Sequence, residues 1–153
     1  MSTTHQFSTF FLDGLFFGVE VLKVQEVIRY QEMTRVPLAP PEISGLINLR
    51  GQIVTALDLR RRLELSPRAA DQLPMNVVVR TDDGAVSLLV DEIGDVVEVS
   101  EEGFERPPDT IRGVARELIR GVYQLKDRLL LILDTEKAVM LDTMNDHGRS
   151  VAQ

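Results

Sequence analysis

The sequence predicts a mainly β protein made of two small units of the barrel or sandwich type, packed on each other. Three observations favour this fold: the apolar segments are short, turn signals recur about every ten residues, and one stretch of the chain is repeated. A chain of 153 residues fits one domain, or two very small ones that share a core.

Six short apolar runs are expected to form β-strands. They are Phe7–Leu12, Phe16–Val21, Ile53–Leu57, Val77–Val79, Val86–Val90 and Leu129–Leu133. Asp13-Gly14 separates the first two runs, and Asp82-Asp83-Gly84 separates the fourth and fifth. Both separators are typical of the turns that close β-hairpins, so we expect two hairpins at these places.

Helical signals are fewer and predict only short helices. Asp58 and Asp134 each precede a helix-forming stretch, and an aspartate caps a helix because its carboxylate accepts hydrogen bonds from free amides of the first turn. A third short helix is expected within Thr110–Ile119, where Gly113 limits it to a turn or two. Val21–Tyr30 fits both periodicities, and we favour a strand that is entered through a short turn.

An internal repeat is the most informative feature of the chain. ISGLINLRGQIVTALD (Ile43–Asp58) recurs without a gap as IRGVYQLKDRLLLILD (Ile119–Asp134). Upstream of it, Phe17–Val27 is loosely echoed by Val86–Val96. Matching blocks in the same order indicate two copies of one small β unit, each too small to be secure alone.

Two kinds of residue mark the entry to each copy. The proline pairs Pro40-Pro41 and Pro107-Pro108 lie upstream, where they favour extended chain. Gly45 and Gly121 hold the same place in the two copies. We expect each glycine to precede a strand, where either a positive φ or a close backbone approach requires it.

Composition excludes several classes of protein. The chain has no Cys, which rules out disulfides, zinc–thiolate sites and thiol catalysis, and its two histidines, His5 and His147, lie near the termini. There is no P-loop, no Gly-x-Gly pair and no Gly-x-Ser-x-Gly motif. The net charge of −7 argues against a nucleic-acid partner. We therefore predict a protein that is not an enzyme, with no catalytic residues, no metal site and no cofactor.

Most charged and polar runs are expected to be solvated. Three carboxylate pairs lie at turns or strand ends: Asp82/Asp83, Asp91/Glu92 and Glu101/Glu102. For the basic run Arg60-Arg61-Arg62 we favour a solvated helix face, with contact to an acidic partner as the alternative. Met1–Gln6 and Asp142–Gln153 are expected to be flexible tails. No apolar run approaches the ~20 residues that span a bilayer, and no targeting signal is present, so we expect a cytoplasmic protein.

Glu26 and Arg50 each lie inside an apolar, β-like stretch. Charges in such places are seldom buried unless they are paired. Two interpretations stay open: the two side chains meet and help to shape a binding surface, or each one points to solvent.

The chain resembles the CheW family, the coupling proteins of bacterial chemosensory arrays. The matching segments are FGVEVLKVQEVI (Phe17–Ile28), TRVPLAPPEISGLINLRGQIVTALDLR (Thr34–Arg60), SLLVDEIGDV (Ser87–Val96) and RGVYQLKDRLLLILDTEKAV (Arg120–Val139). The resemblance extends from about Phe7 to Leu141, and its most specific part is Gly45–Arg60. It implies one CheW-like domain over residues 7–141, made of two intertwined, five-stranded Src-homology-3-like barrels with short helices.

The resemblance also implies a function. Family members are non-enzymatic scaffolds that couple methyl-accepting chemoreceptors to the histidine kinase CheA. The regulatory domain of the kinase would bind barrel to barrel, the cytoplasmic tip of the receptor would dock in a hydrophobic groove between the barrels, and the protein would be recruited to membrane-associated arrays. An adaptor in a related pathway that controls pili, development or cyclic-nucleotide output is an alternative, and a small-ligand-binding barrel is another.

By position in the family pattern, five apolar residues would line the receptor groove: Val24, Val77, Val86, Ile93 and Val96. Glu26 and Arg50 match a charged pair that the family places close to that surface. For each apolar residue, plain core packing is the alternative. Ser87 stands where the family usually has Gly, and Thr55 where Pro is common; Ser87 is expected to narrow the groove or to alter receptor preference.

Overall fold

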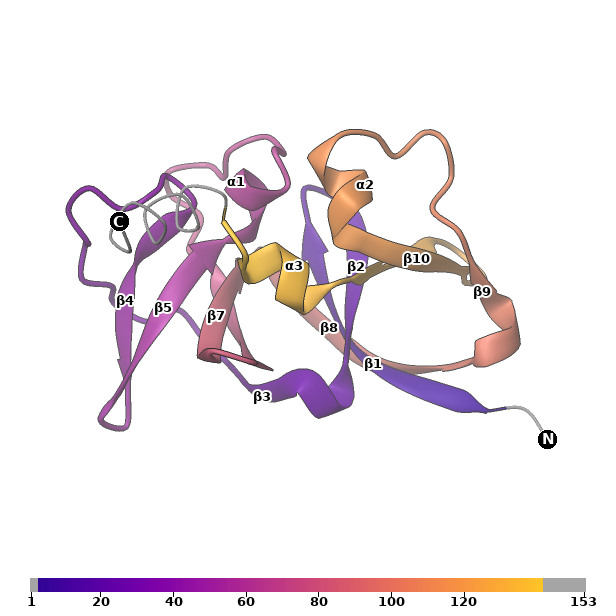
Figure 1. The fold of residues 1–153 in the computed structure, drawn as a ribbon, viewed down its shortest axis with the longest axis horizontal. Helices are drawn as coiled ribbons and strands as arrows, with labels where there is room; N and C mark the ends of the chain where they lie inside the picture. The colour runs from indigo at the N-terminus through magenta and orange to yellow at the C-terminus, as the bar shows by residue number, and fades with distance from the viewer. Residues whose placement is uncertain (1–2, 142–153) are drawn as a thin grey trace, which may run out of the picture.

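The structure, a computed structural model, describes residues 3–141 and contains two β-sheets that lie beside each other (Figure 1). Sheet A has the order β8-β1-β2-β11-β10-β9, and sheet B has the order β3-β6-β7-β5-β4. The strands of sheet A are β1 (Thr4–Leu12), β2 (Leu15–Glu20), β8 (Glu92–Ser100), β9 (Phe104–Glu105), β10 (Ile119–Gln124) and β11 (Leu129–Leu133). Those of sheet B are β3 (Val24–Ile28), β4 (Ile43–Leu49), β5 (Gln52–Asp58), β6 (Met75–Thr81) and β7 (Gly84–Val90).

Short helices lie at the margins of the sheets. They are α1 (Leu59–Arg62), α2 (Val114–Leu118) and α3 (Thr135–Val139), with the 3-10 turns η1 (Val21–Lys23) and η2 (Glu101–Gly103). The carboxylate of Asp58 accepts a hydrogen bond from the Arg60 amide, and that of Asp134 accepts one from the Lys137 amide. Both predicted aspartate caps are therefore confirmed, and each cap starts a helix directly after a strand.

The strand predictions are confirmed, with additions. The six apolar runs lie in strands except for Val21, which begins η1, and both hairpins form. Asp13 and Gly14 have φ of 50° and 78°, as a tight two-residue turn of type I′ requires. Val21–Tyr30 is a short turn followed by a strand, as expected. Neither β8 nor β9 was predicted as a strand. Residues 4–6 were expected in a tail but belong to β1, whereas residues 142–153 lie outside the described residues.

The sequence repeat is also a repeat of structure. Ile43 pairs with Leu57 in the β4–β5 hairpin, Ile119 pairs with Leu133 in the β10–β11 hairpin, and both hairpins carry a bulge one step further on. In each unit the second strand of this hairpin runs parallel to a strand from elsewhere, β5 to β7 and β11 to β2. The two sheets are thus built to one plan.

The chain passes between the sheets twice. It leaves sheet A after β2 and enters sheet B as β3, and it leaves sheet B after β7 and returns to sheet A as β8, which pairs with β1. Sheet B is therefore one contiguous stretch of the chain, residues 24–90. Sheet A is discontinuous, because β1 and β2 precede this stretch and β8 to β11 follow it.

One large apolar core lies between the sheets, and each sheet has a smaller cluster of its own. The shared core includes Phe10, Phe17, Leu57, Val79, Leu88 and Leu131 from the two sheets. Ile47, Leu49, Val54, Ala56, Val78 and Leu89 form the cluster of sheet B, and Phe7, Tyr123, Leu130 and Ile132 form that of sheet A. Because half the chain alone could bury little apolar surface, the shared core is what makes two small units stable together.

Close packing explains the two repeated glycines. Gly45 and Gly121 lie within β4 and β10 rather than before them, and neither has a positive φ, so that part of the expectation is wrong. A Cβ on Gly45 would lie 2.6 Å from the carbonyl oxygen of Thr34, and one on Gly121 would overlap the ring of Phe104. The close-approach alternative is confirmed, because a neighbouring segment crosses directly over each glycine.

We predict that Gly45→Ala lowers the free energy of unfolding by about 1–3 kcal/mol, because the added methyl group meets backbone that cannot move freely. Gly103→Ala is the matched control, since its Cβ would have no neighbour closer than 3.5 Å. Urea unfolding of both variants measures the difference. An equal loss of stability in the two variants would contradict this account of Gly45.

Candidate functional site

Three of the five predicted groove residues lie at the margin of the shared core. Val24 of β3, Val86 of β7 and Ile93 of β8 are half-buried and pack against this core. Val24 pairs with Val79, which pairs in turn with Val86, so these side chains form a row across sheet B. Ile93 comes from sheet A, where it pairs with Phe10. Residues of both sheets therefore contribute apolar surface along the same core.

The other two predicted residues lie at opposite extremes of burial. Val77 is fully buried in the shared core, so its side chain supports this surface from beneath. Val96 of β8 is 58% exposed and is free to touch a partner. Leu22 and Val27 are also exposed apolar residues near Val24 in sequence, and sequence reasoning did not select them. The echo between residues 17–27 and 86–96 could have found Val27, because its two blocks end on Val27 and Val96.

Glu26 and Arg50 meet, so the interpretation in which each side chain points separately to solvent is wrong, whereas a role of the pair in binding stays a prediction. The Arg50 guanidinium donates to both carboxylate oxygens of Glu26, at 3.0 and 3.1 Å. The Glu26 side chain is 17% exposed, whereas that of Arg50 is 79% exposed. Glu26 and Ile28 lie two residues apart on β3, and Ile28 packs against the cluster of sheet B. A bulge between Val24 and Glu26 moves the pair to the opposite face of β3 from Val24, so the pair lies beside the predicted groove residues rather than among them.

Ser87 does not reach the groove. Its side chain is fully buried, and its hydroxyl donates to Oδ1 of Asn76 at 2.7 Å, while the amide of Asn76 donates to the carbonyl of Arg29 at 3.0 Å. The expectation that Ser87 narrows the groove is therefore wrong. Thr55, the other departure from the family pattern, is half-buried in β5 and pairs with Val86 of the groove.

A buried ion-pair network lies where the chain crosses from sheet B to sheet A. Asp91 is the single residue between β7 and β8, and its side chain is 8% exposed. Arg60 of α1 binds it with two hydrogen bonds of 2.6 and 2.9 Å, and Arg68 adds a third of 3.1 Å. The backbone amide of Asp13, in the β1–β2 turn, donates to the same carboxylate at 2.8 Å. One carboxylate therefore ties both sheets and α1 together.

The charges in this network stabilise one another. The hydrogen bond to Asp91 raises the pKa of Arg60 above its ordinary value. Burial by itself raises the pKa of Asp91, but the hydrogen bonds from Arg60 and from the Asp13 amide, together with the charges of Arg60 and Arg68, outweigh burial and leave that pKa below its ordinary value. Both groups stay ionised at neutral pH.

Two of the three arginines expected on a solvated face are structural. Arg60 is buried in the network, and Arg62 donates to the carbonyls of Lys137, Ala138 and Met140 at 2.7–2.9 Å, which holds the end of α3 against α1. Arg61 alone is exposed. The solvated-turn interpretation of the Asp91/Glu92 pair is wrong for Asp91, whose side chain is buried, while Glu92 is exposed. These roles depend on contacts across more than 20 positions of the chain, which local sequence patterns do not report.

The comparisons with known proteins agree over nearly the whole chain. The family model described as "CheW-like domain" matches residues 6–141. The chain belongs to the CheW-like family. It is 31% identical over 139 residues to chemotaxis protein CheW of Klebsiella aerogenes, covering 91% of this chain and 84% of that relative, and 31% identical over 134 residues to chemotaxis protein CheW of Bacillus subtilis, covering 88% and 86%.

A solved structure confirms the fold. The scaffolding protein TtCheW from Thermoanaerobacter tengcongensis matches with a TM-score of 0.83 and 24% identity, covering 92% of this chain and 95% of that one. The expectation of two packed Src-homology-3-like barrels with short helices is confirmed, with β9 as one short strand more than expected in sheet A. The predicted membership of a chemotaxis coupling and scaffold family is confirmed as well. Between residues 3 and 141, no helix is long and apolar enough to cross a membrane.

We predict that Arg60→Ala and Arg50→Ala differ sharply in stability. Removing Arg60 leaves a buried carboxylate without its main partner and costs about 3–5 kcal/mol. Removing Arg50 breaks a pair that is mostly exposed on the arginine side and costs no more than about 1 kcal/mol. Urea unfolding at neutral pH measures both. Similar losses in the two variants would show that the crossing network does not carry the stability assigned to it.

The lowered pKa of Asp91 predicts an acid-sensitive component of stability. This component is fully present above the unfolded-state pKa of about 3.9 and is lost as the pH falls through the lower pKa of the folded state. We therefore expect the free energy of unfolding to decline below about pH 4. In Asp91→Asn this decline is smaller, although the variant is less stable at neutral pH. An unchanged acid slope in the variant would contradict the assignment.

Proposed function

We propose that this protein is a non-enzymatic chemotaxis scaffold that couples methyl-accepting chemoreceptors to the histidine kinase CheA. The observation that carries the proposal is the CheW-like match over residues 6–141. The related proteins from Klebsiella aerogenes and Bacillus subtilis are named chemotaxis proteins, and the related solved structure is named a scaffolding protein. In this role the protein works in the cytoplasm, at membrane-associated receptor arrays.

The groove margin suits the tip of a receptor. Val24, Val86 and Ile93 form a half-buried apolar surface to which both sheets contribute, and Val96 adds an exposed side chain on β8. An amphipathic helix binds such a surface by laying its apolar stripe along it. We assign this surface to the cytoplasmic tip of the receptor, with Val77 as its buried support.

The charged pair suits a role in binding rather than in folding. Arg50 is held by Glu26 at the tip of the β4–β5 hairpin, where its guanidinium is largely exposed. A pair that is exposed on the arginine side is expected to contribute no more than about 1 kcal/mol to stability, and its guanidinium is accessible to a partner. We assign Glu26 and Arg50 to the edge of the receptor surface. The kinase regulatory domain then binds elsewhere, barrel to barrel.

We predict that Val96→Arg prevents binding to receptor cytoplasmic fragments and leaves binding to the CheA regulatory domain unchanged. A cation at this exposed site meets the apolar stripe of the receptor helix without disturbing the core. Leu73→Arg is the matched control, because Leu73 is equally exposed but precedes β6, outside the groove. Co-sedimentation with receptor fragments and titration with the purified regulatory domain measure the two activities.

Failure of the unmodified protein to bind either partner at micromolar concentration would overturn the proposed function. Receptor binding that is equally strong in the Val96→Arg and Leu73→Arg variants would instead overturn the placement of the groove.

A further inference from the structure

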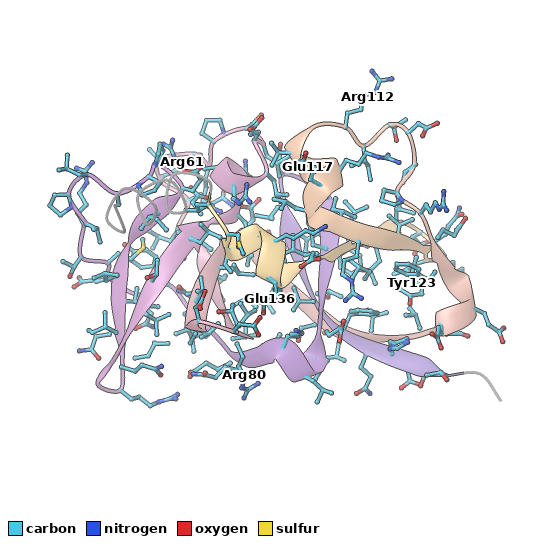
Figure 2. All side chains as sticks on the ribbon, viewed as in Figure 1. Arg61, Arg80, Arg112, Glu117, Tyr123 and Glu136 are labelled. Atoms are coloured by element: carbon cyan, nitrogen blue, oxygen red, sulfur yellow. The ribbon has the colours of Figure 1, made fainter. Side chains whose placement is uncertain are left out.

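A hollow of about 430 Å³ lies at the end of sheet A that is far from sheet B, where Figure 2 labels Tyr123. Aromatic rings line it. The ring centroids of Phe7 and Tyr123 are 5.7 Å apart, and those of Phe104 and Tyr123 are 5.4 Å apart with the planes at 61°. Phe104 is 45% exposed, so part of its side chain is open to a partner. The ends of β-barrels are frequent sites of binding, and we call this hollow the Tyr123 pocket.

The fold does not require these rings. In the repeat, the position of Tyr123 is occupied in sheet B by Ile47, which packs in a cluster without any aromatic residue. Phe104 crosses Gly121 in the same way that Met33 and Thr34 cross Gly45. The same unit therefore packs well with aliphatic side chains, and the rings are particular to one copy.

The Tyr123 hydroxyl is available to a polar partner. The residue is only 4% exposed and lines the pocket, and its hydroxyl makes no hydrogen bond to any group of residues 3–141. Burial raises the pKa of Tyr123, and the negative charges of Glu101 and Glu20 raise it further against the opposing effect of Arg120. The hydroxyl therefore lies in a negative field.

The charged side chains that line the pocket favour a positively charged ligand. Glu20 and Glu101 both line it, against the single cation Arg120, which pairs with Glu20 at 2.7 Å. Glu101 forms no ion pair within the part of the chain that the structure describes. Around the pocket, residues 98–105 carry four glutamates and no basic residue. A basic segment of a partner protein is therefore attracted to this end of the molecule.

We propose that the Tyr123 pocket binds an arginine side chain from a basic segment of a partner protein. A guanidinium group stacks flat on aromatic rings and is attracted by their faces. Its five N–H donors reach several acceptors at once, here the carboxylate of Glu101 and the hydroxyl of Tyr123. The inference does not depend on the identity of the partners proposed above, since it rests on rings, charges and an unpaired hydroxyl outside the groove.

The test is an NMR titration of the whole protein with N-acetyl-arginine amide, compared with N-acetyl-citrulline amide, which has nearly the same shape and no charge. We expect saturable shifts centred on Phe104 and Tyr123 for arginine, with binding in the millimolar range that is usual for a single side chain, and no saturable shifts for citrulline. The chain has no Trp and two Tyr, so in a Tyr30→Phe variant the fluorescence of Tyr123 reports the same binding.

Matched variants locate the site. Glu101→Gln should weaken binding about three- to tenfold, as expected for loss of one charged acceptor, whereas Glu32→Gln, an exposed glutamate elsewhere, should change nothing. Phe104→Leu keeps an apolar cover over Gly121 but removes the aromatic face, so it should abolish saturation. Equal binding of arginine and citrulline, shifts centred elsewhere, or unchanged binding in Glu101→Gln and Phe104→Leu would each overturn the proposal, and none of these results bears on the groove.

Discussion

The carboxylate of Asp91 holds the point where the chain crosses between the two sheets, and the arrangement of the two barrels depends on it. Arg60 and Arg68 neutralise this buried charge, and the amide of Asp13 adds a hydrogen bond from the β1–β2 turn. Residues from α1, the loop after it, the β7–β8 connection and sheet A therefore meet at one group. Because a buried charge without partners is costly, these elements hold one another in a fixed arrangement.

That arrangement also positions the residues of the proposed receptor surface. Val24 and Ile93 belong to different sheets, and both pack on the margin of the shared core. They lie on β3 and β8, the strands with which the chain enters a new sheet, and they match each other in the sequence echo. A surface built in this way exists only when the two sheets are correctly placed. Arg62 adds a second link, because it binds the end of α3 from α1. A scaffold that binds partners simultaneously needs such rigidity, since energy lost in bending between its two barrels would weaken the coupling.

Local patterns in the sequence reported local structure well. The hairpins, the aspartate caps and the repeat follow from turn chemistry, capping and self-similarity, which act over a few residues. The repeat also predicted that the two units share a core, because neither could bury enough surface alone.

The misses have one physical cause, which is distance along the chain. Arg60 and Asp91 are 31 positions apart, Arg62 meets Ala138 76 positions away, and Ser87 meets Asn76 across a hairpin. Each looked like a solvated or surface residue because its partner was not visible nearby. The family pattern selected all five groove residues alike, and only the structure shows that Val24, Val86 and Ile93 are half-buried, that Val77 is fully buried and that Val96 is exposed.

The central claim is that this protein joins receptor and kinase in one complex, and reconstitution tests it directly. Membranes carrying a chemoreceptor are mixed with CheA at fixed concentration, and the kinase that sediments with them is measured as this protein is added. The account predicts that bound kinase rises with added protein to a plateau and falls again at large excess, when separate copies occupy receptor and kinase. Kinase binding to the membranes that is independent of added protein would contradict it.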